Sequence, residues 1–280
     1  MQRYGPLILP SIKLSQGISS RWSHQRTLAQ PTVTVNHVGS VIHSYPVTVE
    51  VVEEQLGNDV TLTMVKLPGG RARIGSCQTE TGRFDHETQL AINIPSFYLG
   101  MMPITQQVYL EVMGCNPTLK CGDNGLLGLD KPVVGITWEE AIAFCHTLTQ
   151  RTGKPYRLPT EFEWEFACRA ETQTPFHFGA TLTPAIANYN GKVAYDAGPR
   201  GISRNTTTPV GQFPPNGFGL FDMHGNVWEW CSQRSNATPV LRGGAWNSHP
   251  WLCRTAVRLR RGANSGLPTF GLRVVCAIAA

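Results

Sequence analysis

At 280 residues, with 28 glycines, 20 prolines and only 15% charged residues, the sequence excludes a helical bundle and favours a loop-rich domain with a substantial core. No apolar run is long enough to span a membrane, and the apolar stretch at residues 6–10 is too short for a secretory signal. We therefore expect a cytoplasmic protein with no membrane partner. The net charge of +5 is uneven, because residues 241–280 carry six arginines and no Asp, Glu or Lys.

The arginine-rich end of the chain does not have the pattern of a nucleic-acid interface. Its arginines alternate with Gly, Ser, Pro and Leu, whereas such an interface places basic residues along one element with stacking aromatics between them. We expect no nucleic-acid partner. The six residues are Arg242, Arg254, Arg258, Arg260, Arg261 and Arg273.

The eight cysteines are scattered and form no CxxC pair, which argues against a structural zinc site. Cys115 and Cys121 could close a small disulfide loop if the compartment were oxidising. Reduced and mostly buried thiols are the expectation for a cytosolic protein.

The first half of the chain predicts strands. Residues 1–30 are rich in Ser, Gln and Arg without a hydrophobic period, which indicates a disordered or loosely ordered leader. β-Branched runs at 32–35 and 47–52 predict a β-hairpin extension over residues 31–58. A further strand is predicted at 60–65, before the Pro-Gly-Gly turn that starts at Pro68.

Two helices are predicted from capping boxes, in which a threonine is followed three residues later by a glutamate. Thr137 and Glu140 form one box, Thr160 and Glu163 form the other, and each precedes an apolar stripe with helical spacing. A shorter helix is predicted at 105–113. The rest of the chain is broken by prolines, so we expect turns and short strands there.

Seven short motifs occur in the order shown by one known family. They are the stretches 64–76, 97–105, 132–141, 157–165, 214–223, 225–231 (GNVWEWC) and 243–246 (GGAW). The series resembles the formylglycine-generating-enzyme/sulfatase-modifying-factor family, a branch of the C-type lectin fold. The resemblance implies an α+β, C-type lectin-like domain over residues 59–280, loop-rich, with few short strands and two to three helices.

The resemblance also implies a structural cation site of the calcium type. The matching positions are the side chains of Asp222 and Glu229 and the carbonyls of Gly225 and Val227, an all-oxygen set that suits a hard cation. The alternative is that the two carboxylates cap loops by accepting hydrogen bonds from backbone amides. A second position near Asn188 lacks a clear acidic partner.

The catalytic members of the family bind copper through two cysteines separated by four residues, because Cu(I) prefers thiolate ligands. The matching positions here are Ser248 and Cys253, and a serine hydroxyl cannot replace a thiolate. Iron-dependent members need an added helical bundle, for which residues 1–58 are too short. We therefore expect no copper and assign no catalytic residue.

Residues 247–269 differ from the asparagine-rich sequence that relatives have in this region. The family letters that remain are Pro250, Cys253, Arg254, Ala256, Arg258, Gly271 and Arg273. The departures resemble the variable region of proteins diversified by retroelements that mutate adenines. Such randomisation of an Asn codon never gives Lys, Glu, Gln or Met, and the segment contains none of these; Trp251 is the one exception to the pattern.

This resemblance implies a non-catalytic protein that binds a protein ligand, with an acidic face on the partner, through a diversified surface. Core burial of Leu252 and Leu259 is the alternative for those two residues. For the whole protein the alternatives are a copper-dependent formylglycine-generating oxidase and a lectin-like module with a fixed partner. The predicted ligand-binding residues are Asn247, Ser248, His249, Trp251, Leu252, Thr255, Val257, Leu259, Arg260, Arg261, Asn264, Ser265, Leu267 and Thr269.

Overall fold

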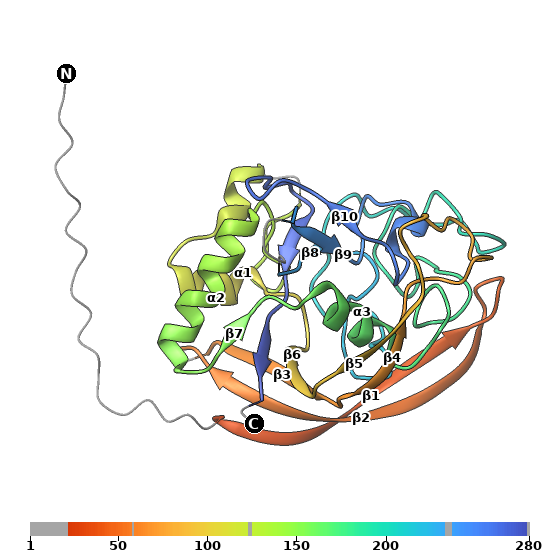
Figure 1. Ribbon diagram of the computed structural model, residues 1–280. Coiled ribbons are helices and arrows are strands. Elements are labelled where there is room, and N and C mark those ends of the chain that lie inside the picture. The colour runs from red at the N-terminus through yellow and green to blue at the C-terminus, as the bar shows by residue number, and fades with distance from the viewer. Residues whose placement is uncertain (1–21, 58, 123–124, 233–236, 279–280) are drawn as a thin grey trace.

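The main sheet joins the two ends of the chain. The computed structural model describes residues 22–57, 59–122, 125–232 and 237–278, so most of the predicted leader lies outside the described residues. Six antiparallel strands form this sheet in the order β1-β2-β3-β6-β12-β7, with β12 between β6 and β7 (Figure 1). They are β1 (His24–Val35), β2 (Val41–Gln55), β3 (Thr61–Leu67), β6 (Phe97–Gly100), β7 (Tyr156–Arg157) and β12 (Val275–Ala277).

The hairpin begins earlier than the predicted boundary at residue 31 and is no extension. β1 starts at His24, which pairs with Glu53, so residues 24–30 are strand and not leader. The early start follows from pairing with β2, because residues 24–30 have no β-branched run of their own. β2 in turn pairs with β3, which places the hairpin in the same sheet as the rest of the domain.

A smaller sheet carries the tryptophan motif and the arginine-rich segment. Its order is β10-β9-β8-β11, and β11 runs parallel to β8 while the other pairs are antiparallel. The segment 247–269 lies between β9 and β11 along the chain and contributes β10. The strands are β8 (Trp228–Trp230), β9 (Val240–Arg242), β10 (Leu259–Arg260) and β11 (Phe270–Leu272); β4 (Gly70–Ile74) and β5 (Leu90–Ile94) form a separate ribbon.

The three predicted α-helices are present, and their local signals explain where they begin. Thr137 and Thr160 both form capping boxes with a glutamate three residues on, as predicted. Thr105 accepts a hydrogen bond from the Val108 amide and caps the shorter helix. The helices are α1 (Gln106–Met113), α2 (Trp138–Thr152) and α3 (Glu161–Arg169), with 3₁₀ turns η1 (Pro117–Cys121) and η2 (Pro250–Cys253).

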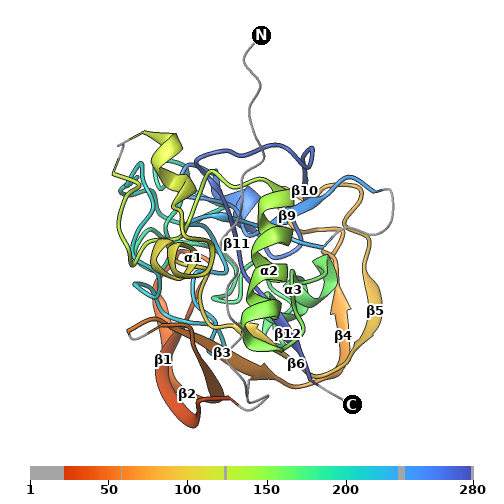
Figure 2. The ribbon, with the colours of Figure 1, turned by 90° about the vertical axis from the view of Figure 1, so that its left-hand side faces the viewer.

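The core is filled by aromatic residues from the motifs. Trp164 and Trp230 are fully buried and Trp228 is nearly so, whereas Trp246 is half-buried at the edge of a smaller cluster. α1 and α2 pack against each other and cover one side of the molecule (Figure 2). In the described residues, no helix is both long and apolar enough to cross a bilayer.

Candidate functional site: the C-terminal segment and the frame beneath it

The exposed part of the segment lies at one end of the molecule. The chain leaves β9, forms η2 and β10, and then crosses the end at which α2 begins, where the Trp138 amide donates to the Ala263 carbonyl (Figure 1). Ten of the predicted ligand-binding residues are accessible there. Asn247, Arg260, Arg261, Asn264 and Leu267 are exposed, and His249, Trp251, Leu252, Leu259 and Ser265 are half-buried.

Four of the predicted ligand-binding residues are buried, so the prediction was wrong for them. The Ser248 hydroxyl accepts from the Ala245 amide at 2.9 Å, and Thr255 donates to the Pro175 carbonyl at 2.9 Å. Val257 packs in the main core. Thr269 is buried where its carbonyl accepts from the Trp228 amide. These side chains hold the segment in place and cannot reach a ligand.

The half-buried aromatic and aliphatic side chains anchor the segment to the core while leaving one side accessible. Trp251 packs against the cluster around Phe176 and lies edge-on to His249, with ring centroids 4.4 Å apart. Leu252 and Leu259 pack against the main core. The core-burial alternative for these two leucines is therefore correct for part of each side chain.

Three of the six arginines are structural. Arg242, Arg254 and Arg273 are fully buried, and each is paired with glutamates from earlier in the chain. Arg254 contacts both oxygens of Glu87 at 2.9 Å. Buried guanidinium groups require such partners because an unpaired buried charge is costly. The sequence contained one indication of these pairs. Residues 241–280 have no acidic residue, so an acidic partner of their arginines must lie elsewhere in the chain.

The charge that a ligand can reach is therefore much smaller than the sequence suggests. Arg258 forms an ion pair with Glu161, with Nε 3.1 Å from Oε2. Within the described part of the chain, neither Arg260 nor Arg261 has an acidic side chain within 4 Å. These two residues supply the accessible positive charge.

The donor set of the predicted cation site does not fit a hard cation. Arg273 Nη2 lies 2.9 Å from Glu229 Oε1, and the Trp164 indole donates to Oε2 at 2.6 Å. The Asp222 carboxylate accepts from the Gly211 amide at 2.8 Å, which agrees with the loop-cap alternative. Arg273 thus already supplies positive charge to Glu229, where the cation was expected.

Asp222 is a buried carboxyl without an ion pair in the described structure, and burial raises its pKa to about 6. The backbone at Asp222 has φ 57°, and its carboxylate also accepts from the Asn226 side-chain amide at 3.4 Å. The residues that the structure describes contain no group of three or more His, Cys, Asp or Glu side chains that could hold a metal. We assign no step to a cation.

The two positions that match the copper ligands are both packed in the frame. Cys253 is fully buried, and burial raises the pKa of its thiol well above the ordinary value. A Cβ at Gly244, which has φ +80°, would lie 2.4 Å from Cys253 Sγ, so the thiol fills the space beneath the double-glycine turn. A protonated, enclosed thiol at one position and a serine at the other provide no thiolate pair.

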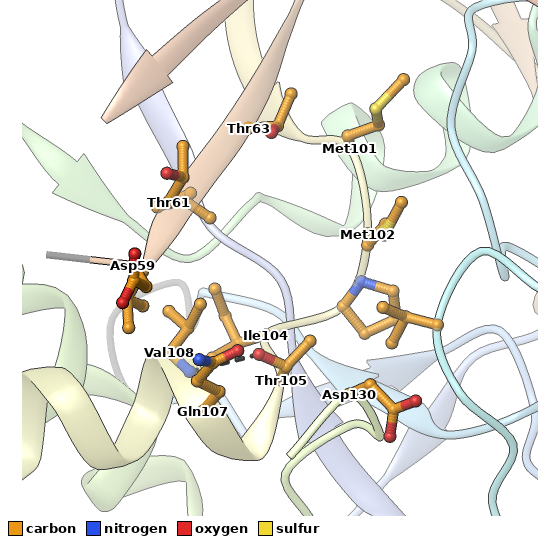
Figure 3. A pocket seen from close by; sticks show the side chains of 14 residues that line it. Asp59, Thr61, Thr63, Met101, Met102, Ile104, Thr105, Gln107, Val108 and Asp130 are labelled. Atoms are coloured by element: carbon orange, nitrogen blue, oxygen red, sulfur yellow. Dashed lines mark hydrogen bonds between the residues drawn. The ribbon is translucent and has the colours of Figure 1, made fainter. Parts of the chain in front are cut away.

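A separate recess of about 330 Å³ lies between β3 and the start of α1, remote in sequence from the segment (Figure 3). Its wall includes Met101 and Met102, and Asp59 and Asp130 lie on opposite sides of it. None of the predicted ligand-binding or cation residues lines it, and we assign it no role.

Three features bear on the family of this domain. They are the loop-rich α+β frame, the accessible C-terminal segment, and the lack of a thiolate pair at the two positions that match the copper ligands. Residues 24–278 match the family described as "Sulfatase-modifying factor enzyme 1-like domain", and the chain belongs to this family. The match includes the hairpin, which the sequence resemblance had placed outside.

Relatives of this chain include enzymes and at least one protein named as inactive. It is 33% identical to the formylglycine-generating enzyme of Mus musculus over 168 residues, covering 51% of this chain and 43% of that one. It is 27% identical to "Inactive C-alpha-formylglycine-generating enzyme 2" of Bos taurus, covering 78% of this chain and 89% of that one. Some curated relatives are much longer: the chain spans 44% of one and 43% of the mouse enzyme.

Among solved structures, the fold is similar to "Treponema denticola variable protein 1", with a TM-score of 0.67 and 22% identity over 81% of this chain and 98% of that one. This likeness confirms the predicted formylglycine-generating-enzyme type of C-type lectin-like fold.

Proposed function

We propose that this protein is a non-catalytic ligand-binding protein whose exposed C-terminal segment forms the ligand surface. One observation carries the proposal: buried residues that keep family letters anchor the segment, and other side chains are exposed between them. The residues that keep family letters are buried, except Arg258, which is held by Glu161. Arg260 and Leu267 are exposed at positions that depart from the pattern, whereas three other departing positions, 248, 257 and 269, are buried. Side chains exposed between the retained residues can change at little cost in stability.

The likeness in fold to a variable protein supports the display of changing side chains on a fixed frame. The relative named as inactive supports a role without catalysis. Because the accessible charge is that of Arg260 and Arg261, the proposed ligand is a protein with an acidic face.

Randomising the exposed positions should leave the fold intact and change what the protein binds. We expect substitutions at Asn247, Arg260, Arg261, Asn264 and Leu267 to change the free energy of unfolding by about 0.5 kcal/mol or less each. A matched library at the buried positions should lose about 1–3 kcal/mol per substitution. The buried set is Ser248, Thr255, Val257 and Thr269.

Protease resistance of the two displayed libraries measures folding, and selection of the first against a purified acidic protein measures binding. Equal loss of folded members from both libraries would rule out a display surface. A tolerant library that yields no binder would rule out ligand binding through these positions.

The alternative function is the copper-dependent oxidation of a substrate cysteine, which family membership favours. Because Ser248 replaces one thiolate and Cys253 is enclosed, we expect no stoichiometric Cu(I) in competition with a chromophoric chelator. We also expect no oxygen-dependent loss of thiol from a cysteine peptide, with the mouse enzyme as the positive control. Tight copper binding and turnover would establish the alternative.

A further inference from the structure

The two accessible arginines differ in their surroundings. Arg260 lines a recess of about 260 Å³ between the start of α3 and the strands β9 and β10. Arg261 does not line it, and its Nη1 donates to the Arg260 carbonyl at 2.8 Å. A ligand group that enters the recess therefore meets the guanidinium of Arg260.

The charged side chains at the recess have a net positive charge. Glu161 lines it, but this carboxylate is paired with Arg258. Arg260 lines the recess without an acidic side chain within 4 Å in the described structure. Arg258 balances the charge of Glu161, so the positive charge of Arg260 is left for a ligand to neutralise.

The remaining polar groups in the recess can complete an anion's hydrogen bonds. Three residues that carry hydroxyls, Thr160, Ser232 and Thr238, are among those that line it. Thr160 is the N-cap of α3, so the positive end of that helix dipole faces the same space.

We propose that the protein partner inserts an acidic side chain into this recess and forms an ion pair with Arg260. This inference rests on the proposed function and deepens it, because it names the chemistry of the contact and its place. A carboxylate is favoured over an aliphatic group because the recess offers a free guanidinium and hydroxyls. Arg261 then contributes only long-range attraction, which salt screens.

The test uses the full chain and peptides selected from a random display library against it. We expect the enriched peptides to share an Asp or Glu. Arg260→Ala should weaken their binding by about 10-fold or more, and Arg261→Ala by less than about 3-fold. Both residues are exposed, so urea unfolding should be unchanged in both variants.

Charge reversal gives a second, independent measurement. Arg260→Glu should abolish binding of the acidic peptide and should bind the same peptide with Lys in place of its Asp or Glu. Arg261→Glu should not show this exchange. Rescue by the lysine peptide requires direct contact, which a general change in surface potential would not produce.

The outcomes separate this inference from the proposed function. The proposed ion pair with Arg260 is wrong if the enriched peptides lack Asp and Glu, or if both alanine variants weaken peptide binding equally. Ligand binding by the segment would still stand in either case. Binding of a single-stranded oligonucleotide that depends on Arg260, without binding of acidic peptides, overturns the proposed ion pair in favour of a nucleic-acid ligand. If no peptide is enriched and the randomised library also yields no binder, both are wrong.

Discussion

Glu165→Gln should lower the free energy of unfolding by about 3–5 kcal/mol, because it removes one partner of a buried ion-pair network. Glu165 is fully buried and bridges two arginines: Arg169 Nη2 lies 2.8 Å from Oε1, and Arg242 Nη2 contacts Oε2. Its Oε1 also accepts from the Gly75 amide at 2.6 Å. Burial would raise the pKa of this carboxyl, but Arg242 and Arg169 hold it below its ordinary value.

The expected loss arises because glutamine keeps the shape of the side chain and removes its charge. Two buried guanidinium groups would then share a neutral partner, and each would lack compensation for its lost hydration. Urea unfolding monitored by tryptophan fluorescence measures the change. The variant should also lose the near-neutral stability that an ionised Glu165 provides above the pKa of an unfolded glutamate.

Glu50→Gln is the matched control, since Glu50 pairs with Lys66 at 3.0 Å on the surface and both side chains are exposed. We expect no measurable change for it. A Glu165→Gln protein as stable as the control would show that Arg169 and Arg242 find other partners, contrary to the arrangement described above.

Asp222→Asn should stabilise the protein at pH 8, by up to about 3 kcal/mol, and the gain should disappear near pH 4. The pKa of Asp222 is raised to about 6, above the ordinary 3.8, so folding above pH 6 must accommodate a buried charge. Between those values the folded protein holds a proton that the unfolded chain has released. The cost of Asp222 therefore grows as pH rises from about 4 to 6 and is constant above that.

Asparagine removes this cost and keeps a side-chain oxygen for the Gly211 amide. Urea unfolding of the parent and the variant at several pH values between 4 and 8 measures how the difference in their free energies of unfolding depends on pH. The buried histidine pair also titrates in acid, since burial lowers the pKa of His224 to about 4, but it is common to both proteins and cancels. Asp85→Asn, at an exposed position, should leave the dependence of the free energy of unfolding on pH unchanged.

The same measurement tests for a cation. If calcium occupied the site, Asp222→Asn would destabilise the protein in calcium, and a chelator would lower the stability of the parent. We expect the pH-dependent gain to be the same in calcium and in chelator, because Glu229 is held by Arg273.

The parts of the fold that the sequence predicted well are those with local causes. The capping boxes at Thr137 and Thr160 involve residues three apart, so both helices could be placed from a few letters. β1 was misplaced because its first residues become a strand only through pairing with Glu53 and its neighbours in β2. Propensity alone does not contain that information.

The candidate site shows the same division. The family motifs located the segment, but which of its side chains face outward depends on distant contacts. Thr255 is buried against Pro175, 80 positions earlier, and Arg254 is paired with Glu87, 167 positions earlier. No periodicity within 247–269 reports these partners, so Thr255 was wrongly predicted to bind the ligand. Arg260 and Arg261, which were also predicted to bind it, are exposed.

The place of β12 in the main sheet has a consequence for how variants of this protein are sampled. Because β12 lies between β6 and β7, the central sheet cannot close until residues 275–277 have left the ribosome. A frameshift or stop codon within 247–269 would delete that strand together with Arg273, and the truncated product could not complete its core. Failure to fold would therefore remove truncated members of the randomised library before the binding selection.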